Sequence, residues 1–212
     1  MTLEDYQELL LQQLDCFGER DYAIQFHDDL SPAGWHLGHC VYTETYWIRE
    51  QLLMTQAVEN PLKELFVPER SLKKERGNKI ASFRELRDWS ERMQAENRRL
   101  IAEYNGQAAD HELIQDDFMF QFLKQHYAQH FETLQMVRAQ RMLREDQEYR
   151  PGNPLESRRQ TDTFIYLNGA DVRIGSGVSW HYDNEKPVFT CQPGPLEISR
   201  LPVNNAAYLY FM

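Results

Sequence analysis

The sequence predicts a mainly α-helical protein, a four-helix bundle followed by a short C-terminal segment that contains β-strands. Three observations predict this fold class. Apolar residues recur at helical spacing through the first 150 residues, helix start signals separate the repeats, and short β-type runs follow. We therefore expect a helical bundle over residues 1–150 and a linker with the incomplete start of a second domain over residues 151–212.

The first two helices are expected over residues 3–17 and from residue 31 to about residue 54. An apolar stripe at helical spacing marks the first. The second begins at Ser31, a residue type that caps helices, followed by Pro32 at the first helical position. A long connection over residues 61–79 follows, and a loop of that length inside a compact domain is usually functional.

The third helix has the clearest start in the sequence. Ser82 and Glu85 form a capping box before an apolar stripe, and Gly106 is expected to end the helix. A fourth helix is expected from about residue 110 or 115 to residue 144. Together these helices would form the bundle.

The sequence pattern changes after residue 150. Short runs rich in β-branched and aromatic residues occupy residues 164–167, 172–174 and 188–190, and an apolar, helix-like stretch closes the chain at 206–212. A segment this short is a poor candidate for an independent core. It either packs on the bundle or begins a domain that this chain does not complete.

The composition limits the partners and the compartment. A net charge of −10 argues against duplex nucleic acid, whose phosphates attract clustered Lys and Arg. No long apolar run and no signal peptide are recognisable, so we expect no membrane partner and a cytoplasmic protein. The three cysteines show no CxxC spacing, which fits a reducing compartment.

Two histidines four residues apart predict a metal site. On a helix, His126 and His130 differ by about 40° around the axis, so both imidazoles can face one ion. A third ligand would come from His36 or His39, because Glu132 lies about 200° from His130 and points away. Three imidazoles with open coordination positions suit catalytic zinc, iron or nickel. The alternative is that His126 and His130 are core or surface histidines that bind no metal.

Two motifs resemble a known family. Residues 31–39, SPAGWHLGH, resemble the opening motif of the DinB-like domain in ergothioneine-type sulfoxide synthases, and residues 126–132, HYAQHFE, resemble that domain's HxxxHxE signature. Residues 182–187, YDNEKP, and residues 198–208 resemble the opening of the formylglycine-generating-enzyme-like (sulfatase-modifying factor) domain that follows in those enzymes. The resemblance spans nearly the whole chain.

The resemblance implies a non-haem Fe(II) oxidoreductase that uses O2 to join a thiol to the imidazole of a histidine derivative as a sulfoxide. By motif position, the implied iron ligands are His39, His126 and His130. Zinc and nickel remain alternative metals, because both also accept three imidazoles.

The resemblance also implies a substrate site in the connection at residues 61–79. The family places basic residues there that bind the carboxylates of the thiol substrate, and Arg70, Lys74 and Arg76 are the matching candidates. The alternative is a solvated, charged loop.

The family's second domain continues past residue 212 and supplies part of the substrate pocket. We therefore expect little or no synthase activity from this chain alone, and a homo-oligomer or a partner chain that completes the domain. Whether the chain is itself an enzyme is left open. The competing functions are a DinB-like zinc- or nickel-dependent thiol transferase or hydrolase, and a non-catalytic metal-binding module.

Overall fold

The structure is a computed structural model that describes residues 1–55, 60–104, 111–145, 156–159 and 163–212. Its internal contacts divide the chain into two units, Met1–Gln147 and Glu148–Met212. The residues around the boundary expected at 150 lie outside the described part of the chain.

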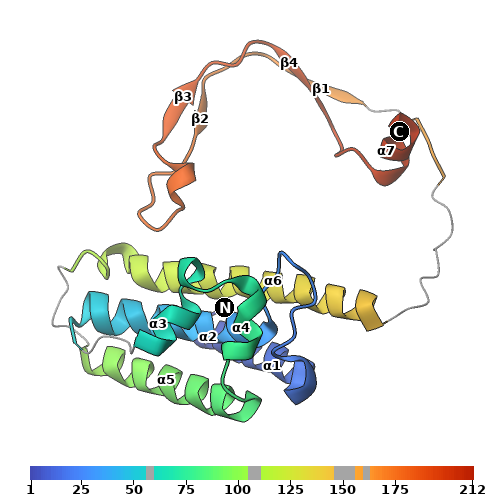
Figure 1. The fold of residues 1–212 in the computed structure, drawn as a ribbon. Coiled ribbons are helices and arrows are strands. Elements are labelled where there is room, and N and C mark those ends of the chain that lie inside the picture. The colour runs from blue at the N-terminus through green and yellow to red at the C-terminus, as the bar shows by residue number, and fades with distance from the viewer. Residues whose placement is uncertain (56–59, 105–110, 146–155, 160–162) are drawn as a thin grey trace. The chain divides into compact units, whose positions relative to one another are not determined.

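Unit 1 is a four-helix bundle, as predicted. It is built from α1 (Leu3–Asp21), α2 (Ala33–Thr45), α5 (Phe83–Tyr104) and α6 (Phe118–Glu145), which lie side by side in Figure 1. Contacts link α1 to α6, α6 to α2, α2 to α5 and α5 to α1, and α1 also contacts α2, so each helix packs on at least two of the others. The largest apolar cluster fills the space between them and includes Leu10, Leu14, Phe17, Leu37, Val41, Leu86, Tyr127, Leu134 and Val137.

Capping boxes start two of the four helices. The hydroxyl of Thr2 accepts from the backbone N–H of Asp5, whose carboxylate accepts from the N–H of Thr2. Ser82 and Glu85 exchange the same pair of bonds at the start of α5, which confirms that predicted helix start. In α1 the backbone at Gly18 has a φ of 65°, one residue after the predicted end, and helical geometry then resumes to Asp21.

The predicted start of the second helix is wrong by one residue. Pro32, and not Ser31, is the N-cap of α2, and no side chain caps this helix end. The hydroxyl of Ser31 accepts a hydrogen bond from Arg76 instead. The hydroxyl oxygen of Ser31, which the sequence pattern assigned to the helix end, therefore binds the buried guanidinium of Arg76.

The second helix also changes character before its predicted end. After Thr45 it continues as a π-helix, Tyr46–Leu52, whose turns are wider than those of an α-helix. This segment buries Ile48 and Leu52 in a second apolar cluster with Met119 and Leu123 of α6. The sequence pattern did not predict the change of helix type.

The predicted long connection before α5 is largely helical, which corrects that expectation. It contains α3 (Asn60–Phe66), a 3₁₀ turn (Pro68–Arg70) and α4 (Lys73–Lys79). Helices of two turns show too few periods for a hydrophobic stripe to be recognised. Gly77 lets α4 approach the chain closely, because a Cβ there would lie 2.1 Å from the carbonyl oxygen of Ala23.

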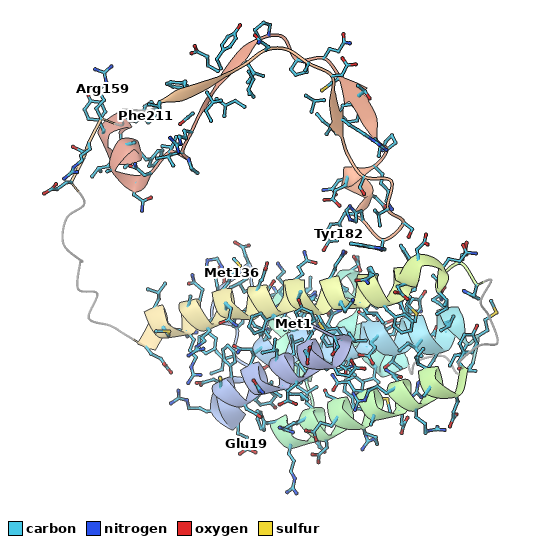
Figure 2. The ribbon with its side chains drawn as sticks, turned by 180° about the vertical axis from the view of Figure 1, so that it is seen from behind. Met1, Glu19, Met136, Arg159, Tyr182 and Phe211 are labelled. Atoms are coloured by element: carbon cyan, nitrogen blue, oxygen red, sulfur yellow. The ribbon has the colours of Figure 1, made fainter. Side chains whose placement is uncertain are left out.

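The fourth predicted helix is α6, which a 3₁₀ turn at Gln115–Asp117 precedes. The predicted helix end at Gly106 lies outside the described residues. On the outer surface of the bundle, Figure 2 labels Glu19 on α1 and Met136 on α6, both of which are exposed.

Unit 2 contains short strands, as predicted. β1 (Phe164–Leu167) pairs antiparallel with β4 (Leu196–Ser199), and β2 (Val172–Ile174) pairs antiparallel with β3 (Phe189–Cys191). The helix α7 (Asn205–Phe211) follows, and β4 was not among the predicted runs. None of the helices in the described part of the chain combines the length and the apolar character needed to cross a membrane.

Candidate metal centre

Three histidines from two packed helices come together in unit 1. His39 of α2 and His126 and His130 of α6 each place one ring nitrogen so that the three atoms lie within 4.8 Å of one another. The Nε2 atoms of His39 and His126 are 3.1 Å apart. Two nitrogens bound at right angles to one ion, with bonds of about 2.1 Å, would be about 3.0 Å apart. Glu132 is exposed and does not belong to this group.

The short helix α3 orients the imidazole of His39. The Nδ1 of His39 lies 2.7 Å from the backbone carbonyl oxygen of Phe66. A carbonyl oxygen can only accept, so Nδ1 carries the proton and Nε2 presents its lone pair toward His126. Trp35 stacks flat on His39, and its own Nε1–H donates to the carbonyl of Leu65 at 2.8 Å. The segment between α2 and α5 therefore sets the tautomer of one candidate ligand.

The two histidines of α6 are held by different neighbours. Phe122, one turn earlier, stacks on His126 with the ring planes inclined by 18°. The Nδ1 of His126 is buried and makes no hydrogen bond within the described part of the chain. The Nδ1 of His130 lies 2.9 Å from the Nδ1 of a fourth histidine, His36.

Burial keeps the imidazoles neutral at neutral pH. It lowers the pKa of His36 and of His126 to about 3, and it also lowers the pKa values of His39 and His130. The positive charge of Arg76 lowers the pKa values of His36 and His39 further. Neutral imidazoles have a free lone pair, which is the form that binds a metal ion.

The three basic residues predicted to bind substrate do not form one cluster of free cations. Arg70 is exposed and ion-paired with Glu64, and Lys74 is exposed. Arg76 is only 3% exposed, and its guanidinium carbon lies 3.8 Å from the ring centroid of Trp35. Among the described residues, the acceptors of its hydrogen bonds are uncharged, namely the hydroxyls of Ser31 and Ser71 and the carbonyls of Pro68 and Ser71.

A buried polar network that sequence reasoning missed lies elsewhere in the bundle. The carboxylate of Glu44, which is 1% exposed, accepts hydrogen bonds from Gln7, Asn97 and Tyr127. Burial raises the pKa of Glu44, whereas these three donors lower it. The network joins α1, α2, α5 and α6. A glutamate among the apolar residues of the predicted second helix was the one available signal.

One known protein family matches most of unit 1. The family model of the DinB superfamily matches residues 2–134, which is more than half of the chain and includes His36, His39, His126 and His130. The match ends before unit 2. None of the curated proteins compared with the chain matches it.

Proposed function

The chain belongs to the DinB superfamily, and on this basis we propose that unit 1 binds one divalent metal ion through His39, His126 and His130. One observation carries the proposal, the convergence of three ring nitrogens from two helices within 4.8 Å. Structural zinc sites use four protein ligands, whereas three leave coordination positions open. The proposed role is therefore to present a metal ion to a substrate.

The surroundings of the ligands support this role. The carbonyl of Phe66 and the indole of Trp35 fix the ring of His39, and burial keeps all three imidazoles unprotonated. Ligand positions that are fixed before the ion arrives reduce the entropic cost of binding it. A divalent ion held here would supply Lewis acidity, and iron would add redox chemistry.

The finer proposal is the iron-dependent joining of a thiol to a histidine derivative. Its support is the sequence resemblance of residues 31–39, 126–132 and 182–187, together with a ligand group that contains no carboxylate. The competing proposal is a zinc- or nickel-dependent thiol transferase or hydrolase. The extent of the family match favours the transferase or hydrolase, because the match covers the bundle and does not include unit 2.

Metal content after anaerobic purification tests the binding proposal. Elemental analysis should find one divalent ion per chain, and replacement of His39, His126 or His130 by Ala should each lower the occupancy sharply. His27→Ala is the matched control, because His27 is exposed and lies outside the group. Unchanged metal content in His126→Ala, with unchanged helical circular dichroism, would remove this site from consideration.

Two loaded forms distinguish the chemistries. For the iron enzyme, oxygen consumption by the Fe(II)-loaded chain should depend on an added thiol and a trimethylated histidine, with the sulfoxide detected by mass spectrometry. For the competing proposal, the zinc- or nickel-loaded chain should add a thiol to an electrophilic acceptor, or cleave a substrate bond with water, without consuming oxygen. Thiol binding has its own readout, since a thiol that enters the Co(II)-loaded site should produce a sulfur-to-cobalt charge-transfer band.

A further inference from the structure

A fourth histidine contacts the candidate ligands without belonging to the group that could hold the ion. His36 lies nearly one helical turn before His39 on α2 and is 4% exposed. Its Nδ1 is 2.9 Å from the Nδ1 of His130, a residue 94 positions away in the sequence. That separation is a hydrogen-bond distance for two ring nitrogens, and such a bond needs one proton between them.

Metal binding decides which ring carries that proton. If His130 binds the ion through Nε2, its Nδ1 must hold the proton and donate it to His36. The reverse arrangement would put the proton of a neutral His130 on Nε2, which would then have no lone pair for the ion. The contact with His36 therefore selects the binding tautomer of His130 only when His36 acts as the acceptor.

We propose that His36 is a positioning residue of the metal centre, a neutral imidazole protonated on Nε2 whose Nδ1 accepts the Nδ1–H of His130. This inference rests on the proposed metal site. Metal-bound histidines usually donate their second N–H to an oxygen acceptor. His39 follows that rule with the carbonyl of Phe66, and His130 would use another imidazole instead.

An imidazole acceptor differs from a carboxylate in its charge. Among the described residues, no hydrogen bond or ion pair joins His36 to a carboxylate, so a charged His36 ring would be buried without a counter-charge. A neutral acceptor fixes the orientation of His130 and leaves the charge of the centre unchanged. The Nε2 of His36 is buried and makes no hydrogen bond there, so Nδ1 is the nitrogen that interacts with the centre.

A fourth metal ligand is the alternative that the experiments must separate from this role. Two nitrogens 2.9 Å apart could also be neighbouring ligands of one ion, if His130 bound through Nδ1. In that arrangement no proton would lie between the two rings. The positions of the protons therefore distinguish a positioning residue from a ligand.

Nuclear magnetic resonance of the zinc-loaded chain shows directly which ring nitrogens of His36 and His130 carry protons. With ¹⁵N-labelled histidine, long-range proton–nitrogen correlations assign the tautomer of each ring. We expect a neutral His36 with its proton on Nε2, and a His130 with zinc on Nε2 and a proton on Nδ1. A proton on Nδ1 of His36, or zinc bound to His36, would overturn the proposal.

A pair of variants tests the same role through affinity. Zinc affinity, measured by competition with a chromophoric chelator, should fall about 10–100-fold in His36→Leu, the usual effect of losing a partner of a metal ligand. His36→Asn should recover most of the loss, because its amide oxygen can accept the proton that Nδ1 accepted. Both variants should still bind one zinc ion per chain at saturation.

The controls separate this proposal from the proposed function. His27→Leu, at an exposed position, should leave the zinc affinity unchanged, and circular dichroism of the metal-free variants checks that they are folded. If the unmodified chain binds no zinc, the metal site itself is wrong. If it binds zinc and His36→Leu binds equally well, or His36→Asn loses as much affinity as His36→Leu, only the positioning role is wrong.

Discussion

The indole of Trp35 lies flat against the imidazole of His39, with ring centroids 4.8 Å apart and ring planes inclined by 6°. The guanidinium of Arg76 lies over the same indole in a cation–π contact. The position of a candidate metal ligand thus depends on a stack that includes a buried cation from α4. Substitutions that leave all three candidate ligands in place can therefore still disturb the centre.

Replacing Arg76 should destabilise unit 1. Arg76→Met removes four hydrogen bonds and a stacking contact, and we expect a loss of about 2–4 kcal/mol in the free energy of unfolding. Arg76→Lys should restore little, because an ammonium cannot reproduce the planar donor geometry. Urea denaturation measures the effect. The exposed Arg70→Lys is the control, with a change of about 0.5 kcal/mol or less.

The Arg76→Lys and Arg70→Lys variants also test the substrate-binding role predicted for Arg70 and Arg76. A residue that binds a substrate carboxylate would weaken substrate binding when it is replaced, without a large change in stability. If Arg76→Lys unfolds at the same urea concentration as the unmodified chain and binds an anionic thiol more weakly, the structural role assigned to Arg76 is wrong.

Gly38→Ala should weaken both the fold and the metal site. A Cβ at this position would lie 2.2 Å from the ring of Phe66, which is 2% exposed and stacked on Trp89. We expect a loss of about 1–3 kcal/mol in unfolding free energy, and lower metal affinity because the Phe66 carbonyl orients His39. Thermal denaturation and chelator competition measure the two effects. Gly194→Ala meets no atom within 4 Å and should change neither.

Tyr127→Phe should cost stability and spare the metal. The phenol of Tyr127 donates to the buried carboxylate of Glu44 at 2.7 Å, and removing the donor leaves that acceptor less well satisfied. A loss of about 1–3 kcal/mol is expected. Tyr210→Phe is the control, because Tyr210 is 59% exposed. A fall in metal content that accompanies the stability loss would show that the network and the centre are coupled.

The metal-free chain should lose stability in mild acid. In the folded chain the pKa values of His36 and His126 are about 3, whereas an unfolded histidine titrates near pH 6.5. Between these values the unfolded chain binds protons that the folded chain does not, so stability falls as the pH falls through this window. Each such histidine contributes a slope of up to about 1.4 kcal/mol per pH unit.

Denaturation curves in the presence of a chelator test this dependence. Below about pH 6.5 the unfolding free energy should decrease steadily, and His126→Phe should lower the slope by the contribution of one histidine. The control is His27→Phe, at an exposed position, which should leave the slope unchanged. Identical slopes in His126→Phe and the unmodified chain would contradict the expectation.

The sequence predicted the parts of the fold and the candidate site that depend on local spacing. The i, i+4 pair His126 and His130 shares a helix face whatever surrounds it, and the capping box at Ser82 needs only neighbours within four residues. The bundle follows from apolar stripes long enough to be recognised. These features require no knowledge of distant contacts.

Local spacing could not predict contacts between distant segments, and the expectation that His39 joins the pair on α6 came from the need for a third ligand and from the family resemblance. Nothing local in the basic run at residues 70–76 shows that Arg76 is buried, because its acceptors include Ser31, which lies 45 residues away. The contact between His36 and His130 spans 94 residues. The two-turn helices α3 and α4 were missed for a different reason, since they contain too few turns to show a pattern.

His39 and His126 lie 87 residues apart in the sequence, with α3, α4 and α5 between them. A chain whose helices had formed but not yet packed would offer an ion only the pair on α6, a weak chelate. The full set of three imidazoles exists only once α2 has docked on α6. During refolding, the onset of metal binding would therefore report when α2 docks on α6. Circular dichroism would report helix formation separately.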